Sequence, residues 1–320
     1  MAAVANVAEK QPDRDAAVHD DRMRPTDLIY PVAPGSEVLR EQFRNYRPQS
    51  GAADLQRSET MVQWIDRQRL ASQVLAGTFL NLGSSAAVEI AAGMGFDWLL
   101  LDLEHGSGSW ADLRPLLLAA AGSSAVPIVR VRSADADDVK FVMDSGAAGI
   151  MFPYIGTPAE AARAVSLVKY PPLGVRGVAQ VIRATSYGRA WQSYLAEANA
   201  RSLVIVQIET PEAVEQAEAI AAVPGVDVLF VGPMDLSVNM GHPGDFTQPL
   251  FLQHLQTVVR ACERHGRTAG ILSRPELVEQ HKAFGFRFVA LGSDASAIAT
   301  GMTQNLAAIR RQGLVGHDRG

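Results

Sequence analysis

The stretch FDWLLLDLEH (residues 96–105) is an apolar run that breaks off into three residues able to do chemistry. Seven further short apolar runs, rich in Val, Ile and Leu, recur along the chain, and several of them also end in polar side chains. Strands that are buried on both faces have continuous apolar sequences, which is typical of a parallel sheet covered by helices. The polar residues at the ends of these runs are Asp102, Glu104, His105, Arg130, Gln207, Glu209 and Asp235.

The apolar runs alternate with amphipathic segments, giving eight strand–helix pairs from about residue 61 onward. Eight β/α repeats over roughly 250 residues predict an α/β fold of the TIM (β/α)8 barrel type. A doubly wound open sheet is the alternative, but its GxGxxG phosphate signature is absent, because the first strand ends in NLGSS. The predicted strands are 74–80, 96–103, 127–131, 148–153, 202–209, 226–232, 267–273 and 287–293. In a closed barrel their C-terminal ends meet at one mouth.

The sequence predicts two regions. Residues 1–60 are polar and interrupted by prolines, so we expect an irregular N-terminal extension. Residues 61–320 form the barrel domain, which ends in a C-terminal helix. Two long connections, 170–202 and 232–248, interrupt the alternation of strands and helices. Long connections in compact domains often line a site. We therefore expect either connection to reach the mouth of the barrel.

Composition excludes several classes of protein. The chain has 320 residues, of which 48% are apolar, and its net charge of −5 with no basic stripe makes nucleic acid an unexpected partner. No run of 18 apolar residues exists, so we expect no membrane span. The single cysteine, Cys262, rules out an internal disulfide. The start of the chain lacks the long apolar stretch of a signal peptide, so a cytoplasmic protein is expected.

Two carboxylates, Glu209 and Asp235, end neighbouring strands of the predicted barrel. Hard divalent ions such as Mg²⁺ and Mn²⁺ prefer oxygen ligands, and Mg²⁺ is often held by one or two carboxylates with water or substrate completing the shell. These two residues therefore predict a metal site at which a 2-oxo acid could chelate. The alternative is a pair of structural carboxylates bound to backbone amides or to arginine.

Arg130 ends the third predicted strand, and its guanidinium fork matches a carboxylate or a developing oxyanion. A structural ion pair is the alternative, and the sequence leaves open whether Arg130 or Arg132 faces the site.

His105 follows the second predicted strand, where an imidazole could transfer a proton near neutral pH. Asp102 and Asp144 are candidates to fix its tautomer, and a purely structural histidine is the alternative. The remaining histidines are predicted to be surface residues: His19, His242, His254, His265, His281 and His317.

Several motifs together resemble the HpcH/HpaI aldolases, which are class II, metal-dependent pyruvate aldolases of the phosphoenolpyruvate/pyruvate superfamily. The resemblance covers about residues 71–311. The motifs are GFDWLLLDLEHG, VPIVRV, YPPLGVRGV, VQIET and VDVLFVGPMDLSVNMG. The resemblance implies a homo-oligomer, a hexamer or trimer of dimers, whose C-terminal helix is exchanged between subunits. It also implies a resident divalent metal: Mg²⁺, Mn²⁺ or Co²⁺.

The resemblance assigns roles to individual residues. Glu209 and Asp235 would bind the metal. Arg130 would stabilise the pyruvate enolate. His105 would be the acid/base residue, with Asp144 as its dyad partner.

Substrate-binding residues also follow from the resemblance. Gln207, Gly232 and Pro233 would line the pyruvate pocket. Phe79 and Leu272 fall where the family contacts the acceptor aldehyde. These acceptor-side positions look more apolar than a diacid substrate would require.

The expected function is a carbon–carbon lyase that cleaves or forms 4-hydroxy-2-oxo acids from pyruvate and an aldehyde. An oxaloacetate decarboxylase, or an enolate-trapping enzyme like macrophomate synthase, a related branch with an N-terminal extension, is the alternative. A catalytically silent barrel used for binding is a third reading, but the intact polar residues at the strand ends argue against it. A Schiff-base aldolase is not expected, because no lysine falls at a strand end in the mouth.

Overall fold

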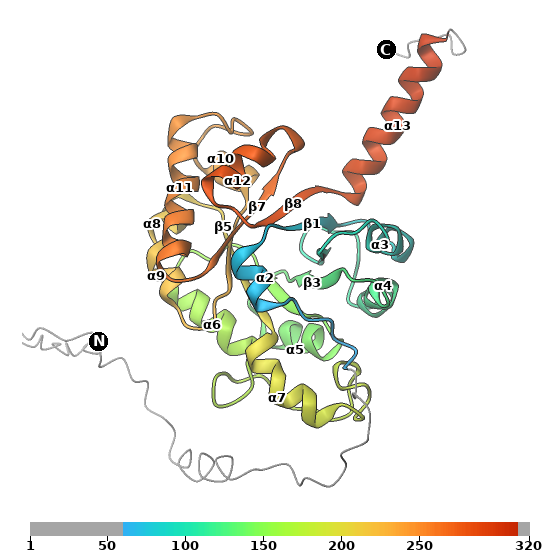
Figure 1. Cartoon of the computed structure of the whole chain (residues 1–320), viewed down its shortest axis with the longest axis vertical. Coiled ribbons are helices and arrows are strands. Elements are labelled where there is room, and N and C mark those ends of the chain that lie inside the picture. The colour runs from blue at the N-terminus through green and yellow to red at the C-terminus, as the bar shows by residue number, and fades with distance from the viewer. Residues whose placement is uncertain (1–59, 313–320) are drawn as a thin grey trace, which may run out of the picture. The chain divides into compact units, whose positions relative to one another are not determined.

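The structure, a computed structural model, describes residues 60–312, and these form a closed barrel of eight parallel strands (Figure 1). Each strand pairs with its neighbours in chain order, and β8 pairs with β1 to close the ring. The predicted TIM barrel is therefore confirmed, whereas all but the last residue of the predicted extension lies outside the described residues. The strands are β1 Leu75–Leu80, β2 Trp98–Asp102, β3 Val126–Arg130, β4 Gly149–Phe152, β5 Leu203–Ile208, β6 Val228–Val231, β7 Thr268–Ser273 and β8 Phe288–Ser293.

Alternate residues of each strand point into the barrel, where they form an interior apolar cluster separate from the layer between strands and helices. Leu100, Ile128 and Ile205 belong to the interior cluster, and at its centre Trp98 stacks on Phe288 with ring centroids 4.0 Å apart. Moving two residues further along β2, β3 and β5 keeps the inward direction and reaches the mouth. Because side chains point inward at every second position, the residues that follow the interior apolar ones at the mouth are Asp102, Arg130 and Gln207.

The helices cover the outside of the barrel (Figure 1). Several begin at side-chain caps: Thr157 forms a capping box with Glu160, and Thr210 accepts from the backbone N–H of Ala213. None of the described helices is long and apolar enough to cross a bilayer. They are α2 Arg67–Ser72, α3 Ser85–Ala92, α4 Leu113–Ala120, α5 Ala136–Asp144, α6 Pro158–Val168, α7 Trp191–Arg201, α8 Pro211–Glu215, α9 Ala217–Ala222, α10 Pro233–Asn239, α11 Pro249–Arg264, α12 Val278–Phe284 and α13 Asp294–Arg311.

The two long connections lie at opposite ends of the barrel. The segment 170–202 joins α6 to β5, so it lies where strands begin, and none of its residues lines the mouth cavity. It is ordered by the short helix η1 (Arg183–Thr185) and by α7. The expectation that this segment reaches the mouth is therefore wrong within one chain. The connection 232–248 does reach the mouth, and α10 forms its first part.

Candidate active site

A cavity of about 400 Å³ opens at the C-terminal mouth of the barrel. The structure brings all of the predicted site residues except Asp144 to its walls. The predicted residues that line it are Phe79, His105, Arg130, Gln207, Glu209, Gly232, Pro233, Asp235 and Leu272.

Arg130 faces this cavity and is fixed by carboxylates that follow or end β2. Its Nε donates to Oδ1 of Asp102 at 3.0 Å, and its Nη2 donates to Oδ2 at 2.7 Å. Its Nη1 also lies 3.0 Å from Oε2 of Glu104. Arg132 instead donates to the backbone oxygen of Leu103. The question left open by the sequence is thereby settled in favour of Arg130.

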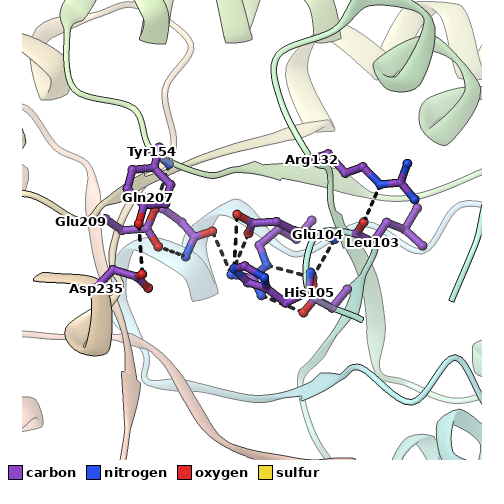
Figure 2. A network of polar contacts seen from close by, with 10 residues as sticks. Leu103, Glu104, His105, Arg132, Tyr154, Gln207, Glu209 and Asp235 are labelled. Carbon is purple, nitrogen blue, oxygen red and sulfur yellow. Dashed lines mark hydrogen bonds and ion pairs between the residues drawn. The ribbon is translucent and has the colours of Figure 1, made fainter. Parts of the chain in front are cut away.

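Glu209 and Asp235 lie on the β5–β6 side and are joined through Tyr154 (Figure 2). Gln207 Nε2 donates to Oε1 of Glu209 at 3.0 Å, and the backbone N–H of Tyr154 donates to Oε2 at 2.8 Å. The Tyr154 hydroxyl donates to Oδ1 of Asp235 at 3.1 Å. Tyr154 has a φ of +50°, a left-handed conformation that a bulky residue rarely adopts. This strained residue therefore contacts both candidate metal ligands.

The electrostatics of this side favour a cation. Burial raises the pKa of Glu209 to about 7, and the neighbouring charges of Asp235 and Glu104 act in the same direction, while the Tyr154 N–H and Arg130 oppose them. Burial also raises the pKa of Glu104. Within residues 60–312 no group of three or more His, Cys, Asp or Glu side chains is arranged to hold a metal. The protein would thus supply two hard oxygen donors, a set that fits Mg²⁺-like ions with open coordination positions.

Gly232 and Pro233 shape the floor beside Glu209. A Cβ atom on Gly232 would lie 2.5 Å from Oε1 of Glu209, so only glycine leaves this carboxylate in place. Pro233 begins α10, which puts Asp235 in the first turn of that helix. These two residues therefore determine where both carboxylates can lie.

His105 lies at the rim, with its side chain 68% exposed and its Nε2 3.6 Å from Oε1 of Glu104. Asp102 accepts from the backbone N–H of His105 and binds Arg130, so it does not hold the imidazole. Asp144 is the one predicted site residue that the structure does not bring to the mouth. It ends α5, and Nη2 of Arg176 donates to it at 2.7 Å. Because helices run back against the strands, the end of α5 lies at the other end of the barrel, and one chain does not form the predicted dyad.

Comparison with known proteins identifies the family. The model of the HpcH/HpaI aldolase/citrate lyase family matches residues 75–300. The chain belongs to this family. It is similar to the hydroxypyruvate/pyruvate aldolase of Paraburkholderia phytofirmans, with 42% identity over 243 residues, covering 74% of this chain and 93% of the relative. It is also similar to the 5-keto-4-deoxy-D-glucarate aldolase of Salmonella arizonae, with 40% identity over 238 residues, covering 74% and 92%.

Solved structures agree. An HpcH/HpaI aldolase/citrate lyase family protein from Burkholderia cenocepacia is 39% identical, with a TM-score of 0.73 over 76% of this chain and 98% of that one. The chain is therefore a carbon–carbon lyase, an aldolase of the HpcH/HpaI family.

Three residues of this aldolase were not assigned to the site from the sequence. Glu104 was found at the end of its apolar run but was given no role. Tyr154 follows the end of β4, so the same rule would have found it had it been applied to that strand. His281 was predicted to be a surface residue, which is wrong. It is 3% exposed, it lines the cavity, and its Nδ1 lies 2.8 Å from the Ser273 hydroxyl. The helix that carries it turns this one side chain inward under the β7 end of the barrel.

We expect the stability of the aldolase to fall as the pH drops from about 6.5 to about 4, in part because of His281. Burial lowers the pKa of His281 to about 4, whereas an unfolded histidine titrates near 6.5. The unfolded chain therefore binds a proton first, and the contribution to stability, at most about 3 kcal/mol, is complete above pH 6.5 and lost by pH 4.

Urea denaturation at a series of pH values checks this. His281→Asn should flatten the slope between pH 6.5 and 4, whereas His242→Asn, at an exposed position, should not. An unchanged slope in His281→Asn would show that this imidazole is not held neutral.

Proposed function

We propose that this chain is a divalent-metal-dependent pyruvate aldolase that forms and cleaves 4-hydroxy-2-oxo acids reversibly. The observation that carries the proposal is that Glu209, Asp235 and Arg130 line one cavity at the barrel mouth. Two similar relatives are named as aldolases, one of hydroxypyruvate and pyruvate and one of 5-keto-4-deoxy-D-glucarate, which supports this class of reaction.

Glu209 and Asp235 would hold the metal, which is Mg²⁺, Mn²⁺ or Co²⁺ in this proposal. Both offer carboxylate oxygens. Burial, together with the charges of Asp235 and Glu104, raises the pKa of Glu209, so a bound cation would stabilise its charged form. Bound there, the cation would supply Lewis-acid stabilisation for the charge that develops on the keto oxygen of pyruvate.

Arg130 would share that charge. Its guanidinium is already fixed by Asp102 and Glu104, so no reorganisation is needed when the enolate forms. Its Nη1 lies 3.4 Å from Oε1 of Gln207, so the guanidinium would lie beside pyruvate if Gln207 lines the pyruvate pocket as proposed. His105, accessible at the rim, would give or take the proton at its Nε2, directly or through water.

The side chains that line the cavity would orient the substrate. Gln207, Gly232 and Pro233 surround the pyruvate end, while Phe79 and Leu272 lie on the acceptor side of the same cavity. Phe79 also packs under Arg130, whose guanidinium carbon lies 5.2 Å from the ring centroid. These apolar surfaces would exclude water while the carbon–carbon bond forms.

The test is a panel of aldehydes incubated with pyruvate and Mg²⁺, Mn²⁺ or Co²⁺, with aldol product measured by mass spectrometry. Metal-dependent product with at least one aldehyde supports the proposal. Oxaloacetate is assayed in parallel, because loss of CO₂ from it would give the same enolate. Oxaloacetate decarboxylation without any aldol product would favour the alternative decarboxylase or enolate-trapping enzyme.

Tyr154→Phe should weaken divalent metal binding about tenfold, because groups that orient metal ligands typically contribute one to two orders of magnitude to affinity. The variant keeps the backbone N–H that binds Glu209 and loses only the hydroxyl bond to Asp235. That hydroxyl stays protonated, since burial and the bond to Asp235 raise its pKa to about 12.

Calorimetric titration with Mn²⁺ measures the Kd directly. Tyr187→Phe is the matched control, because Tyr187 lines a separate cavity. Equal affinities of Tyr154→Phe and wild type would show that the hydroxyl does not position Asp235.

We also propose a homo-oligomer in which α13 packs on a second copy. This helix extends away from the barrel, and none of its residues is buried (Figure 1). Ile298, Met302, Leu306 and Ile309 expose 42–67% of their surface and recur at helical spacing along one stripe. Such a stripe is typical of a subunit interface rather than of a solvated face.

Met302→Glu combined with Leu306→Glu should therefore shift the mass measured by light scattering toward the monomer. Gln304→Glu adds a charge on the other side of α13 and should leave the mass unchanged. A wild-type protein that is monomeric at micromolar concentration would contradict the proposed assembly.

A further inference from the structure

The β7 side of the cavity carries a second guanidinium. Arg274 follows β7 directly, and it lines the cavity next to Leu272 and Ser273. Its guanidinium carbon lies 4.5 Å from the centroid of the Phe246 ring, which in turn packs on Phe251 with centroids 5.4 Å apart. A cation stacked on an aromatic face in this way is positioned without being neutralised.

No carboxylate of residues 60–312 lies within ion-pair distance of Arg274. Glu276, two residues along the chain, makes no ion pair with Arg274. Two other acidic residues near the site have different partners. Glu279 pairs with Lys282, and Asp245, beside Phe246 in the chain, accepts from Thr247 and Gln248. This contrasts with Arg130, which forms ion pairs with Asp102 and Glu104.

The position of Arg274 separates it from the proposed pyruvate pocket. Pyruvate would lie among groups from β3, β5 and β6, whereas Arg274 follows β7, and its neighbour Leu272 is on the predicted acceptor side. A molecule that extends from the enolate carbon past Leu272 would therefore place its far end near Arg274. An unpaired guanidinium at that end matches a carboxylate, which it can bind with two parallel hydrogen bonds.

We infer that Arg274 determines acceptor specificity by selecting aldehydes that carry a carboxylate at the end away from the carbonyl. The inference rests on the proposed aldolase function and adds the class of acceptor. It also revises the expectation of an apolar acceptor side: Leu272 and Phe79 would contact the carbon chain, and Arg274 the charged end. Arg274 directly follows β7, as Glu209 directly follows β5, so the rule about strand ends would have found it had it been applied to this strand.

The experiment compares two aldehydes of four carbons with pyruvate as donor: succinic semialdehyde, which carries a carboxylate, and butanal, which does not. The enzyme is the full chain loaded with Mn²⁺. The variants are Arg274→Gln, Arg274→Lys and, as a matched control, Arg260→Gln on the exposed face of α11. The quantity measured is the ratio of kcat/KM for succinic semialdehyde to kcat/KM for butanal.

We expect this ratio to fall at least tenfold in Arg274→Gln, mainly through KM for the charged aldehyde, because a hydrogen-bonded charge pair at a binding site is lost. Arg274→Lys should recover part of the ratio, and Arg260→Gln should keep it. In wild type, raising the salt concentration should lower the ratio, because the attraction is partly screened.

An unchanged ratio in Arg274→Gln overturns the inference and leaves the aldolase function standing, since both aldehydes are still condensed with pyruvate. A wild type that condenses neither aldehyde, nor any other of the panel, overturns the aldolase function and this inference together.

Discussion

Glu209→Gln should lower kcat/KM for aldol formation from pyruvate about 10³-fold, which corresponds to about 4 kcal/mol of transition-state stabilisation. The amide keeps the shape of the side chain and can still accept the Tyr154 N–H through its oxygen, while its NH2 group can donate to Gln207 once the Gln207 amide turns its oxygen toward it. It removes the negative charge that would hold a divalent cation at the mouth. The loss should therefore appear both in turnover and in the Kd for Mn²⁺.

The fold should survive this change. Glu209 is 2% exposed, and burial already disfavours its charged form, as the raised pKa indicates. The metal-free variant should therefore unfold at a temperature no lower than that of metal-free wild type. Glu212→Gln, in the first turn of α8 and exposed, is the matched control and should be fully active. If Glu209→Gln retained wild-type kcat/KM, this carboxylate would have no part in the chemistry.

Arg130→Ala should also reduce turnover about 10³-fold, and it should in addition destabilise the fold by about 3–5 kcal/mol. Arg130 is 8% exposed, and its guanidinium is paired with the buried carboxylate of Asp102 through two hydrogen bonds. Removing it leaves Asp102 buried without a counter-charge. The catalytic loss and the stability loss thus come from the same contacts.

Arg130→Lys separates these two effects. It restores a positive charge near Asp102 but not the two-pronged fork, so most of the stability should return while most of the activity does not. Arg132→Ala is the control, since Arg132 is exposed and donates to the Leu103 carbonyl outside the cavity. Urea denaturation and steady-state kinetics measure both quantities. Full activity in Arg130→Lys would show that a simple charge suffices.

The sequence predicted the barrel well because buried parallel strands leave an unmistakable pattern. Every predicted strand overlaps an observed one, and Asp102, Arg130 and Gln207 lie at the mouth because inward residues recur at every second position. A rule about strand ends therefore also placed Glu209 and Asp235. The positions of the strands and of the polar residues at their ends follow from local periodicity, which can be read from a single sequence.

What the sequence could not predict depends on how elements pack. Asp144 resembles a family position, but the end of α5 lies at the other end of the barrel in the same chain, where Arg176 binds it. His281 is on a helix whose buried face is set by its contact with β7. Tyr154 reaches Asp235 only because its backbone adopts a positive φ. None of these three contacts produces a periodic pattern in the sequence.

The predicted start of the first helix also differs from the structure. The amphipathic pattern of MVQWIDRQRLA (61–71) predicts a helix over the whole stretch, but α2 begins after Asp66, whose carboxylate accepts the backbone N–H groups of Gln68 and Arg69. Val62 and Ile65, before that cap, pack into the interior cluster of the barrel instead. Apolar spacing suggested a longer helix because both arrangements bury the same residues.

The exchange of pyruvate methyl protons with D₂O, followed by NMR without any aldehyde, tests the central claim most directly, because it reports enolate formation alone. We predict that wild type stripped of metal by a chelator does not exchange, that Mn²⁺ or Mg²⁺ restores exchange, and that Glu209→Gln stays inactive with either ion. Exchange at the full rate after exhaustive metal removal, or an unaltered rate in Glu209→Gln, would contradict the assignment of Glu209 and Asp235 as a metal site that activates pyruvate.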